Sequence, residues 1–448
     1  MKSRILACIG ITVFTALAMP VWLAAQEQSA TQEQRVEAPY IVEDLGPVGG
    51  PPGQPYLITN NGWVSGAAPG PDGTIQAVLW YKGLELDIGT PGLKGPNSAA
   101  FGVNERRQAV GQAETSVTNG EDFCGFNFHG FPSHTACLPF SWQNGVMRKL
   151  PTLGGANGFA NSVNNRGEVA GLAETTLQDP TPGCPVLQFK PVIWKNGVVH
   201  ELDPYPGDTD GVAAQINDRG QVVGASGSCA SFNPNSGLYL VENHALLWEN
   251  GKVTDLGNLG GTGGIAGNHA CAINNRGHVV GPSELADDAT FHGFLWTRET
   301  GMRDLGTLPA DYASLALGIN EAGEVVGASL DADFNPRAML WKKGVMADLN
   351  TLIPTSSALY LLLANSINSS GAITGLAVTS SGELHGFLAK PRCRADESES
   401  TAPATRRDLM KAGCSSRECA QGDDAGGRPP HAVAKRLRDS PRGPPRVR

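Results

Sequence analysis

His129 and His134 lie five residues apart in a stretch that also contains Glu121 and Asp122. Imidazole and carboxylate groups in such proximity could bind a metal ion or transfer protons. The stretch is rich in Gly, Pro and Phe, and two histidines in such a segment are more often exposed loop residues. We therefore interpret it as a surface loop that can contact a ligand, and we predict no metal centre there.

Asp331, Asp333 and Asn335 have the alternating spacing of oxygen ligands that a calcium-binding loop uses. Pro336, however, stands where the tight turn of such a loop requires glycine, and no glutamate follows at the distance of the final ligand. We expect a solvated loop and no cofactor, with calcium at these three residues as the less favoured alternative.

A recognisable catalytic motif is missing from the sequence. No Gly-x-Ser-x-Gly elbow supports a Ser–His–Asp triad. Gly260–Gly264 resembles a phosphate-binding loop, but it lies between two predicted strands and adjoins no helix-forming segment. Recurring tryptophans could stack on sugar rings, but they lie in continuous apolar runs, which favours packing in the core. These are Trp80, Trp142, Trp194, Trp248, Trp296 and Trp341. We therefore predict a protein without enzymatic activity.

All these residues sit within a repeated unit. One copy reads Ala272–Gly277 (AINNRG), Val279–Gly281 (VVG), His292–Trp296 (HGFLW) and Asp304–Gly306 (DLG). The phrase Ile-Asn-x-x-Gly-x-x-x-Gly, or a close variant, occurs seven times with a period of about 45 to 60 residues, which indicates a solenoid, a propeller or an array. The seven copies begin at Ile58, Val103, Val163, Ile216, Ile273, Ile319 and Ile367.

Each phrase has the length and composition of a short β-strand. The apolar runs suit strands that are buried on both faces. Asn144-Gly145, Asn196-Gly197 and Asn250-Gly251 follow the Trp phrase, and Asn-Gly between apolar runs is the strongest local signal for a hairpin. Asn-x-x-Gly makes a second hairpin. Each unit therefore has four strands, which we call a, b, c and d in chain order.

The two ends of the repeat region predict how the array is completed. The region starts with an isolated d strand at Tyr40–Gly46 and ends with a, b and c strands at Leu361–Ala389. The first strand can complete the last sheet, and this closure removes exposed sheet edges. The predicted fold is all-β: a β-propeller of seven four-stranded blades that is closed by the N-terminal strand.

As a set, these phrases resemble the HAF repeat, which is named for its His-Ala-Phe strand and found in bacterial extracellular proteins. The resemblance covers about Tyr40 to Ala389. It implies an extracytoplasmic β-repeat protein of unassigned function, with no catalytic residues to carry over. His244, His292 and His385 retain the histidine, but other units have a different residue there, so a shared functional role is not expected.

The b–c connections are long in three consecutive blades: Ser116–Ala136, Thr176–Lys190 and Ser226–Asn243. Because strands alternate in direction, these insertions must project from one face of the ring. Cysteines accompany them, and an exported chain permits disulfides. We predict a Cys124–Cys137 bond, because these two residues flank the first insertion. The pairing of Cys184, Cys229 and Cys271 stays open.

The two termini lie outside the repeat. Residues 1–25 predict a signal peptide, with an uncleaved anchor as the alternative, and residues 26–38 a flexible lead-in. Residues 39–392 form the propeller, and residues 393–448 have the composition of a disordered basic tail. The net charge is −9; the tail has 12 basic and 8 acidic residues, and the remainder has 22 and 35. An acidic body argues against a nucleic-acid partner.

The sequence therefore predicts a secreted or periplasmic binding module, monomeric and without stable membrane insertion once the signal is cleaved. The partner would be an extracellular glycan, peptide or protein. The alternatives are a propeller enzyme acting on extracellular polysaccharide or peptide, and a structural cell-surface protein. We place binding on the long loops, because specific contacts concentrate on loops that a rigid scaffold holds. The candidate residues are Asp122, Asn127, His129, Phe131, His134, Asn233, Asn235 and Tyr239.

Overall fold

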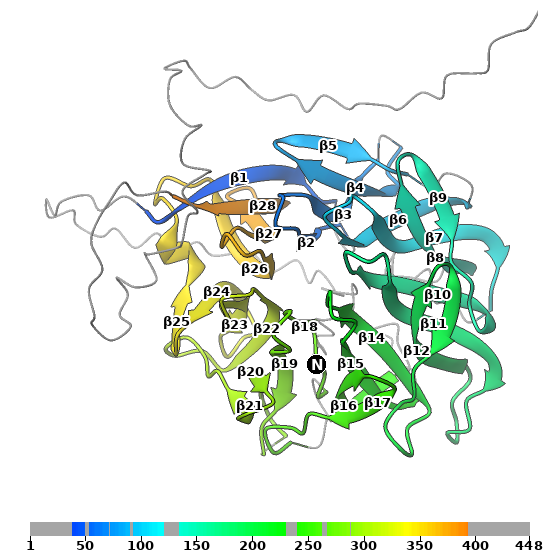
Figure 1. Cartoon of the computed structure of the whole chain (residues 1–448). Coiled ribbons are helices and arrows are strands. Elements are labelled where there is room, and N and C mark those ends of the chain that lie inside the picture. Colours follow the sequence, from blue (N-terminus) through cyan, green and yellow to red (C-terminus); the bar gives the residue numbers. More distant parts are fainter. Residues whose placement is uncertain are drawn as a thin grey trace, which may run out of the picture.

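The computed structural model describes residues 38–49, 53–70, 72–89, 93–120, 134–229, 240–261, 267–286 and 288–392. The predicted signal peptide, nearly all of the lead-in and the tail lie outside these ranges. Within them, seven four-stranded antiparallel sheets form a ring, as Figure 1 shows, and the predicted seven-bladed β-propeller is confirmed. No helix among the described residues is long and apolar enough to cross a membrane.

Blades 1 to 6 each contain four consecutive strands, numbered from the central axis outward, and blade 7 combines three consecutive strands with β1. The innermost strands are β2 (Pro55–Ile58), β6 (Lys94–Val103), β10 (Gly154–Val163), β14 (Asp210–Ile216), β18 (Ala272–Ile273), β22 (Ala313–Ile319) and β26 (Leu359–Ile367). The second strands are β3 (Val64–Pro69), β7 (Ala109–Thr118), β11 (Val169–Gln178), β15 (Val222–Cys229), β19 (Val279–Glu284), β23 (Val325–Leu330) and β27 (Ile373–Thr379).

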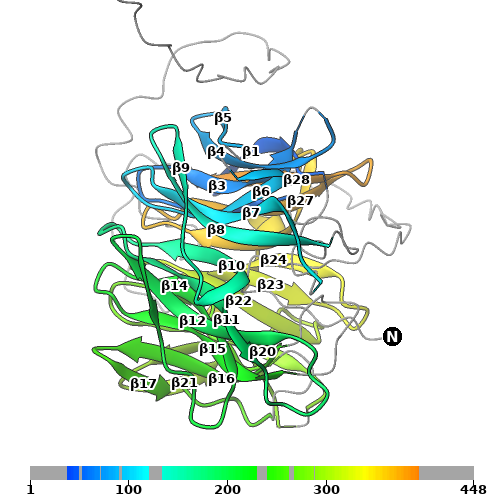
Figure 2. The ribbon, with the colours of Figure 1, turned by 90° about the vertical axis from the view of Figure 1, so that its right-hand side faces the viewer.

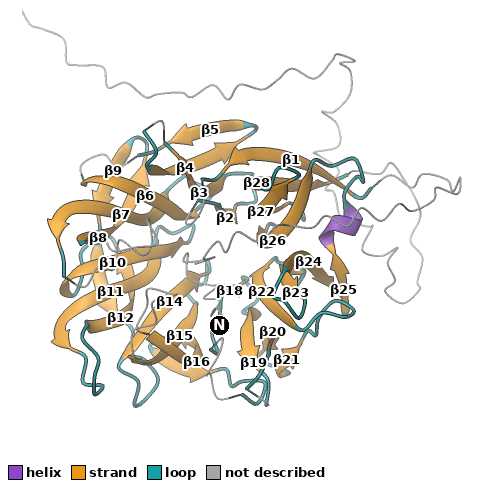
Figure 3. Cartoon of the chain, turned by 180° about the vertical axis from the view of Figure 1, so that it is seen from behind, coloured by secondary structure: helices purple, strands orange, loops and turns teal. Residues whose placement is uncertain are grey.

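The third strands carry the recurring tryptophans, and the outermost strands are short. The third strands are β4 (Ile75–Tyr81), β8 (Thr135–Gln143), β12 (Leu187–Lys195), β16 (Leu240–Glu249), β20 (Phe291–Thr297), β24 (Pro336–Lys342) and β28 (Leu384–Pro391). The outermost strands are β5 (Leu84–Asp87), β9 (Val146–Lys149), β13 (Val198–Glu201), β17 (Lys252–Asp255), β21 (Gly301–Asp304), β25 (Val345–Asp348) and, for blade 7, β1 (Tyr40–Pro47). One helical turn, η1 (Leu349–Leu352), follows β25 (Figure 3).

Strand β1 closes the ring. It pairs antiparallel with β28, from Tyr40 opposite Pro391 to Pro47 opposite His385. The blue and orange strands lie side by side in Figure 1 although they come from opposite ends of the repeat region. The predicted closure by the N-terminal strand is therefore confirmed.

Local sequence explains the hairpins within each blade. Asn144, Asn196 and Asn250 have positive φ values of 50°, 53° and 52°, as a two-residue Asn-Gly turn requires. The glycine that ends each Val-Val-Gly phrase has a different role. A Cβ atom at Gly224 would lie 2.0 Å from the carbonyl oxygen of Val212, and one at Gly327 would lie 1.8 Å from that of Leu315. The innermost strand approaches too closely there for any side chain.

Apolar side chains pack between neighbouring blades, and Figure 2 shows blades 1 to 4 stacked one above another. Trp80, Trp142, Trp194 and Trp248 are at most 5% exposed and belong to clusters that join two blades. These four tryptophans are core residues, as predicted, whereas Trp296 and Trp341 are partly buried and pack against similar clusters. Their burial leaves the central axis and the loop faces as the places where a ligand could bind.

Candidate functional site at the central channel

A cavity of about 230 Å³ lies on the axis of the ring, and residues from all seven blades line it. They come from the innermost strands and from the turns that follow them. These turns are the short a–b turns, so the cavity lies toward the face opposite the long insertions. We expected binding on the opposite face, where the long loops lie.

A first ring of side chains below the mouth holds the blades together. Asn217 donates from Nδ2 to the carbonyl oxygen of Asn274 in the next blade, at 2.9 Å. Its Oδ1 accepts the backbone N–H groups of Arg219 and Gln221, both at 3.0 Å, and so fixes its own turn. All six asparagines at this position make the same interblade bond, at 2.9–3.1 Å: Asn104, Asn164, Asn217, Asn274, Asn320 and Asn368. Blade 1 has Thr59, which receives such a bond at its carbonyl.

A second ring of residues forms the mouth itself. Each of them directly follows a first-ring residue in the sequence. The backbone N–H of Asn165 donates to Oδ1 of Asp218 at 2.7 Å, and that of Asp218 donates to Oδ1 of Asn275 at 2.9 Å. Similar bonds link six of the seven junctions. The mouth residues are Asn60, Glu105, Asn165, Asp218, Asn275, Glu321 and Ser369. Three of them are acidic and none is basic.

Deeper in the cavity the pattern of the repeat is lost. The deep layer is formed by the residue three positions before the first-ring asparagine, or before Thr59 in blade 1. This residue is Tyr56 in blade 1, Phe101 in blade 2, Asn161 in blade 3 and Asn365 in blade 7. These four blades are neighbours in the ring. The ring centroids of Tyr56 and Phe101 are 5.0 Å apart in an edge-to-face arrangement. The other three blades present Ala214, Cys271 and Leu317. One wall is thus aromatic and polar, and the opposite wall is small and apolar.

Asn161 is the residue in this layer whose hydrogen-bonding capacity is not filled. Its Nδ2 donates to the carbonyl oxygen of Ala213 at 3.0 Å. Its Oδ1 is buried and has no hydrogen-bond partner, and the whole residue is only 7% exposed. An unmet buried acceptor costs roughly 1–3 kcal/mol, and such groups commonly bind a ligand or an ordered water. Asn161 borders the cavity, so its Oδ1 is a candidate acceptor for an N–H or O–H donor of a ligand.

Of the loop residues predicted to bind a ligand, only His134 lies within the described residues. It is exposed, with a φ of 53°, and its carbonyl oxygen accepts the backbone N–H of Asn119 at 2.9 Å. The other seven candidates lie outside the described ranges: Asp122, Asn127, His129, Phe131, Asn233, Asn235 and Tyr239. Cys124 also lies outside them, so the Cys124–Cys137 pairing stays a prediction, although Cys137 is disulfide-bonded. The insertions are shorter than predicted, because β7 continues to Thr118 and β11 to Gln178.

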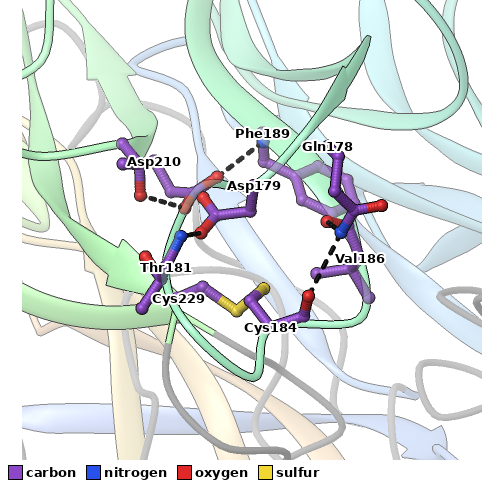
Figure 4. The surroundings of a disulfide bond; sticks show 9 residues. Gln178, Asp179, Thr181, Cys184, Val186, Phe189, Asp210 and Cys229 are labelled. Carbon is purple, nitrogen blue, oxygen red and sulfur yellow. Dashed lines mark hydrogen bonds between the residues drawn. A yellow bond between two sulfur atoms is a disulfide. The ribbon is translucent and has the colours of Figure 1, made fainter.

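A Cys184–Cys229 disulfide joins the connections of blades 3 and 4 on the long-loop face (Figure 4). It resolves part of the pairing that the sequence left open. Beside it, Asp179 and Asp210 are both buried, at 4% and 5% exposure. Burial, together with a hydrogen bond to Asp179, raises the pKa of Asp210 to about 7. Asp179 has a pKa below its ordinary value: burial, the largest effect, opposes this shift, but hydrogen bonds from Asp210 and Thr181 outweigh it.

A second cavity, of about 430 Å³, lies between blades 2 and 3 on this face. Asn119 and Gly120 line one side, and Pro185, Val186 and Leu187 line another. Glu174 at this cavity is only 1% exposed, and its Oε2 accepts the backbone N–H of Asn157 at 3.1 Å. Its carboxylate therefore anchors the first part of strand β10 in its own blade.

The loop that contains Asp331, Asp333 and Asn335 is stabilised by its own side chains. Asp331 accepts the backbone N–H groups of Asp333 and Asn335 at Oδ1, both at 2.9 Å, and Nδ2 of Asn335 at Oδ2, at 3.0 Å. Burial, the largest effect, acts to raise the pKa of Asp331, but the hydrogen bonds from Asn335 and Asp333 hold it below its ordinary value. The carboxylate thus shapes the turn.

The histidines of the repeat have structural partners. His292 lies 2.9 Å from the carboxylate of Asp304 on the neighbouring outer strand, and His385 lies 2.9 Å from that of Asp44. In both pairs the aspartate also accepts the N–H of the following glycine, Gly306 or Gly46. These contacts tie the third strand of a blade to its outermost strand.

Sequence reasoning missed the residues at the mouth and in the deep layer of the channel. A signal was nevertheless present: aligned on the asparagine, the repeat keeps Ile or Val one position before it but varies freely three positions before it. A position that varies while its neighbours are constant is one that packing between blades does not determine.

No family model matches the sequence, and no curated protein matches it. Among solved structures, a triple mutant of AofleA from Arthrobotrys oligospora is 9% identical with a TM-score of 0.31, over 79% of this chain and 86% of its own. Dipeptidyl peptidase 4 from Porphyromonas gingivalis (9% identity, TM-score 0.37) matches 77% of this chain, and TolB from Acinetobacter baumannii (9%, 0.30) matches 76%. This chain spans 60% and 55% of those two proteins. Similarity at this level supports no inference about ligand or activity.

Proposed function

We propose that the protein is an extracytoplasmic binding module that holds a small or slender ligand in the central cavity. The observation that carries the proposal is Asn161, whose buried Oδ1 lacks a partner where the deep layer departs from the repeat. The Cys184–Cys229 disulfide supports an exported protein, because disulfides persist in oxidising compartments.

The surroundings of Asn161 suit recognition. Neighbouring walls combine the aromatic rings of Tyr56 and Phe101 with the amide of Asn365, all of which border the cavity. Binding pockets typically combine apolar and aromatic surface with a few placed polar groups. The interblade bonds fix these groups before a ligand arrives, which reduces the entropic cost of binding. A volume of about 230 Å³ favours a small ligand or one slender segment of a longer one.

A propeller enzyme remains the alternative, since three carboxylates border the mouth. Both oxygens of Glu105 accept backbone N–H groups of blade 1, at 2.8 and 3.1 Å, and both oxygens of Asp218 accept donors from Asn165. Carboxylates that act in hydrolysis must be available to substrate and water. The engagement of Glu105 and Asp218 with the scaffold favours binding over catalysis, which commonly needs a pair of available carboxylates.

The long-loop face is the other candidate location. The Cys184–Cys229 disulfide braces two neighbouring connections there, and the cavity between blades 2 and 3 adjoins them. This is the location that the insertions predicted, and the same ligand screen can compare it with the channel.

The experiment is a screen of the purified protein against extracellular glycans, cell-wall fragments, peptides and small metabolites, followed by variants that separate the two faces. Ser369→Trp should block the mouth, because Ser369 is exposed there and contributes its backbone N–H, rather than its side chain, to the mouth ring. Ala322→Trp is the matched control: Ala322 is exposed on the same face and does not line the cavity. A third variant replaces residues 120–133 and 230–239 by short glycine-containing turns, which keeps the flanking strands and the Cys184–Cys229 disulfide.

For a ligand found in the screen, Ser369→Trp should abolish binding, while Ala322→Trp and the loop-trimmed variant should bind like the parent. Loss of binding in the loop-trimmed variant alone would move the site to the long-loop face. Turnover of a screened polysaccharide or peptide, abolished by Ser369→Trp, would replace the binding module by the enzyme.

A further inference from the structure

We infer that the ligand of the central cavity carries an organic ammonium group. The inference deepens the proposed function and rests on it. It follows from which hydrogen-bonding groups of the cavity are already used and which remain, and from the charge at the mouth.

The amide donors of the cavity are largely used by the scaffold. The six asparagines of the first ring donate to carbonyl oxygens of the next blade, and Asn161 donates to Ala213. Asn365 donates to the carbonyl oxygen of Pro55 at 2.7 Å. Among the acceptors of the cavity, Oδ1 of Asn161 remains without a partner, which favours a ligand that brings an N–H or O–H donor.

Charge at the mouth narrows the choice to a cation. Glu105, Asp218 and Glu321 border the cavity, and its lining among the described residues includes no Lys, Arg or His. Glu321 accepts the backbone N–H of Asn275 at Oε1, at 2.9 Å, which leaves Oε2 for a ligand. The low-dielectric walls of the cavity concentrate the electric field of these carboxylates. The field raises the local concentration of cations at the mouth.

Basic residues on the same face lie outside the lining. Arg106, Arg166, Arg219 and Arg276 each occupy the next position in their turn and are exposed. Arg166 pairs with Glu168, and Arg219 lies 3.9 Å from Glu249. These arginines offer the competing possibility, an anionic ligand held on the rim, and the experiment includes it as an outcome.

The ligand must also be elongated. Asn161 lies in strand β10, which ends at Val163, whereas the mouth residue of its blade, Asn165, lies in the following turn, so a ligand that contacts both must span more than one level of the cavity. Apolar side chains such as Ile216 and Ile319 border the cavity between these levels. A chain with an ammonium group at the mouth and a further donor at Asn161 matches this arrangement. An aliphatic polyamine and an oligomer of amino sugars share that chemistry.

The experiment compares four probes by calorimetric titration at low and at physiological salt. Spermidine and the glucosamine trimer carry ammonium groups, the N-acetylglucosamine trimer is neutral, and the galacturonate trimer is anionic. One of the two ammonium probes should bind at least about tenfold more tightly than the neutral trimer at low salt, and the difference should shrink as salt screens the mouth. Whichever of the two binds identifies the source of the ammonium group.

Glu321→Gln tests the charge itself. Glutamine keeps the carbonyl oxygen that Asn275 needs, so the mouth ring stays closed, while one negative charge is removed. We expect the ammonium probe to bind about two- to fivefold more weakly and any binding of the neutral trimer to be unchanged. The matched control is Glu299→Gln, because Glu299 is exposed in a c–d turn of the same face and does not line the cavity.

Equal or tighter binding of the neutral or the anionic trimer, blocked by Ser369→Trp, would overturn the ammonium assignment while the channel remained a binding site. An unchanged affinity of the ammonium probe in Glu321→Gln, with an unchanged melting temperature, would overturn it as well. Failure of all four probes together with a screened ligand that is insensitive to Ser369→Trp would instead refute the proposed function.

Discussion

Asn217 shows how much of this fold depends on one side chain per blade. It bonds its own turn through Oδ1 and the next blade through Nδ2, and it is 5% exposed. Asn217→Ala should lower the free energy of unfolding by roughly 2–4 kcal/mol, because buried donors and acceptors lose their partners. Asn217→Thr should cost only about 1 kcal/mol, since a hydroxyl can still accept the turn N–H, as Thr59 accepts that of Trp63 at 2.8 Å. Urea denaturation measures both, and equal losses would show that the bonds within the turn contribute nothing separately.

Asp210 makes stability depend on pH. Its pKa is raised to about 7 by burial and by the hydrogen bond to Asp179, so the folded state holds a proton that the unfolded state releases near pH 4. This contribution is fully present below about pH 4 and is lost as pH rises through about 7. Asp179, whose pKa is lowered, acts in the opposite direction only below that window. We expect the melting temperature to fall between pH 5 and pH 8, with a smaller fall in Asp210→Asn.

The difference in melting temperature between wild type and Asp210→Asn isolates the contribution of Asp210. The neighbouring groups Lys190, Asp208 and His244 are present in both, so their contributions cancel in the difference. Parallel pH profiles for wild type and Asp210→Asn would show that the two carboxyl groups do not share a proton.

At the scale of elements, β1 is the one strand that must return from the far end of the repeat region. Its loss would remove the pairing with β28, the buried Tyr40 and the contact between Asp44 and His385. Deleting residues 39–46 should expose the edge of β28 and lower the melting temperature by roughly 10 °C. Glu43→Gln, which removes only the exposed pair with Lys390, should change it by about 1 °C or less. A truncated protein that melts like its parent would mean that blade 7 is stable with three strands.

The disulfides connect elements that the sheets do not. Cys184 and Cys229 lie 45 residues apart, and replacing both by serine should lower the free energy of unfolding by roughly 2–4 kcal/mol. Peptide mapping without reductant should recover this pair and, as the sequence predicts, Cys124 linked to Cys137. Free thiols at Cys124 and Cys137 in protein from an oxidising compartment would contradict that second pairing.

At the scale of the whole molecule, the ring from Tyr40 to Pro391 is complete in its strand pairing. A chain that ends at Pro391 should therefore melt within about 1 °C of the full protein, because the predicted tail has few apolar residues to bury. Scanning calorimetry on both forms checks this. A large loss of stability would show that residues 393–448 pack on the propeller.

Sequence periodicity alone was sufficient to derive the architecture. Seven copies of a four-strand unit, Asn-Gly turns and an isolated first strand determine blade number and closure, because each is a local pattern that repeats. The burial of Trp194 follows in the same way from its apolar neighbours, and the structure agrees at 1% exposure. The sequence also indicated Cys184 and Cys229 as bonding candidates, but their pairing with each other required the distance between two loops.

The channel site was decided by tertiary structure alone. Tyr56, Phe101, Asn161 and Asn365 are separated by at least 45 residues in sequence, and only closure of the ring places them around one cavity. Whether Oδ1 of Asn161 has a partner depends on side chains of other blades, which no local pattern records. Periodicity reports what each unit needs in order to pack, whereas a binding site depends on where the units differ once they have been brought together.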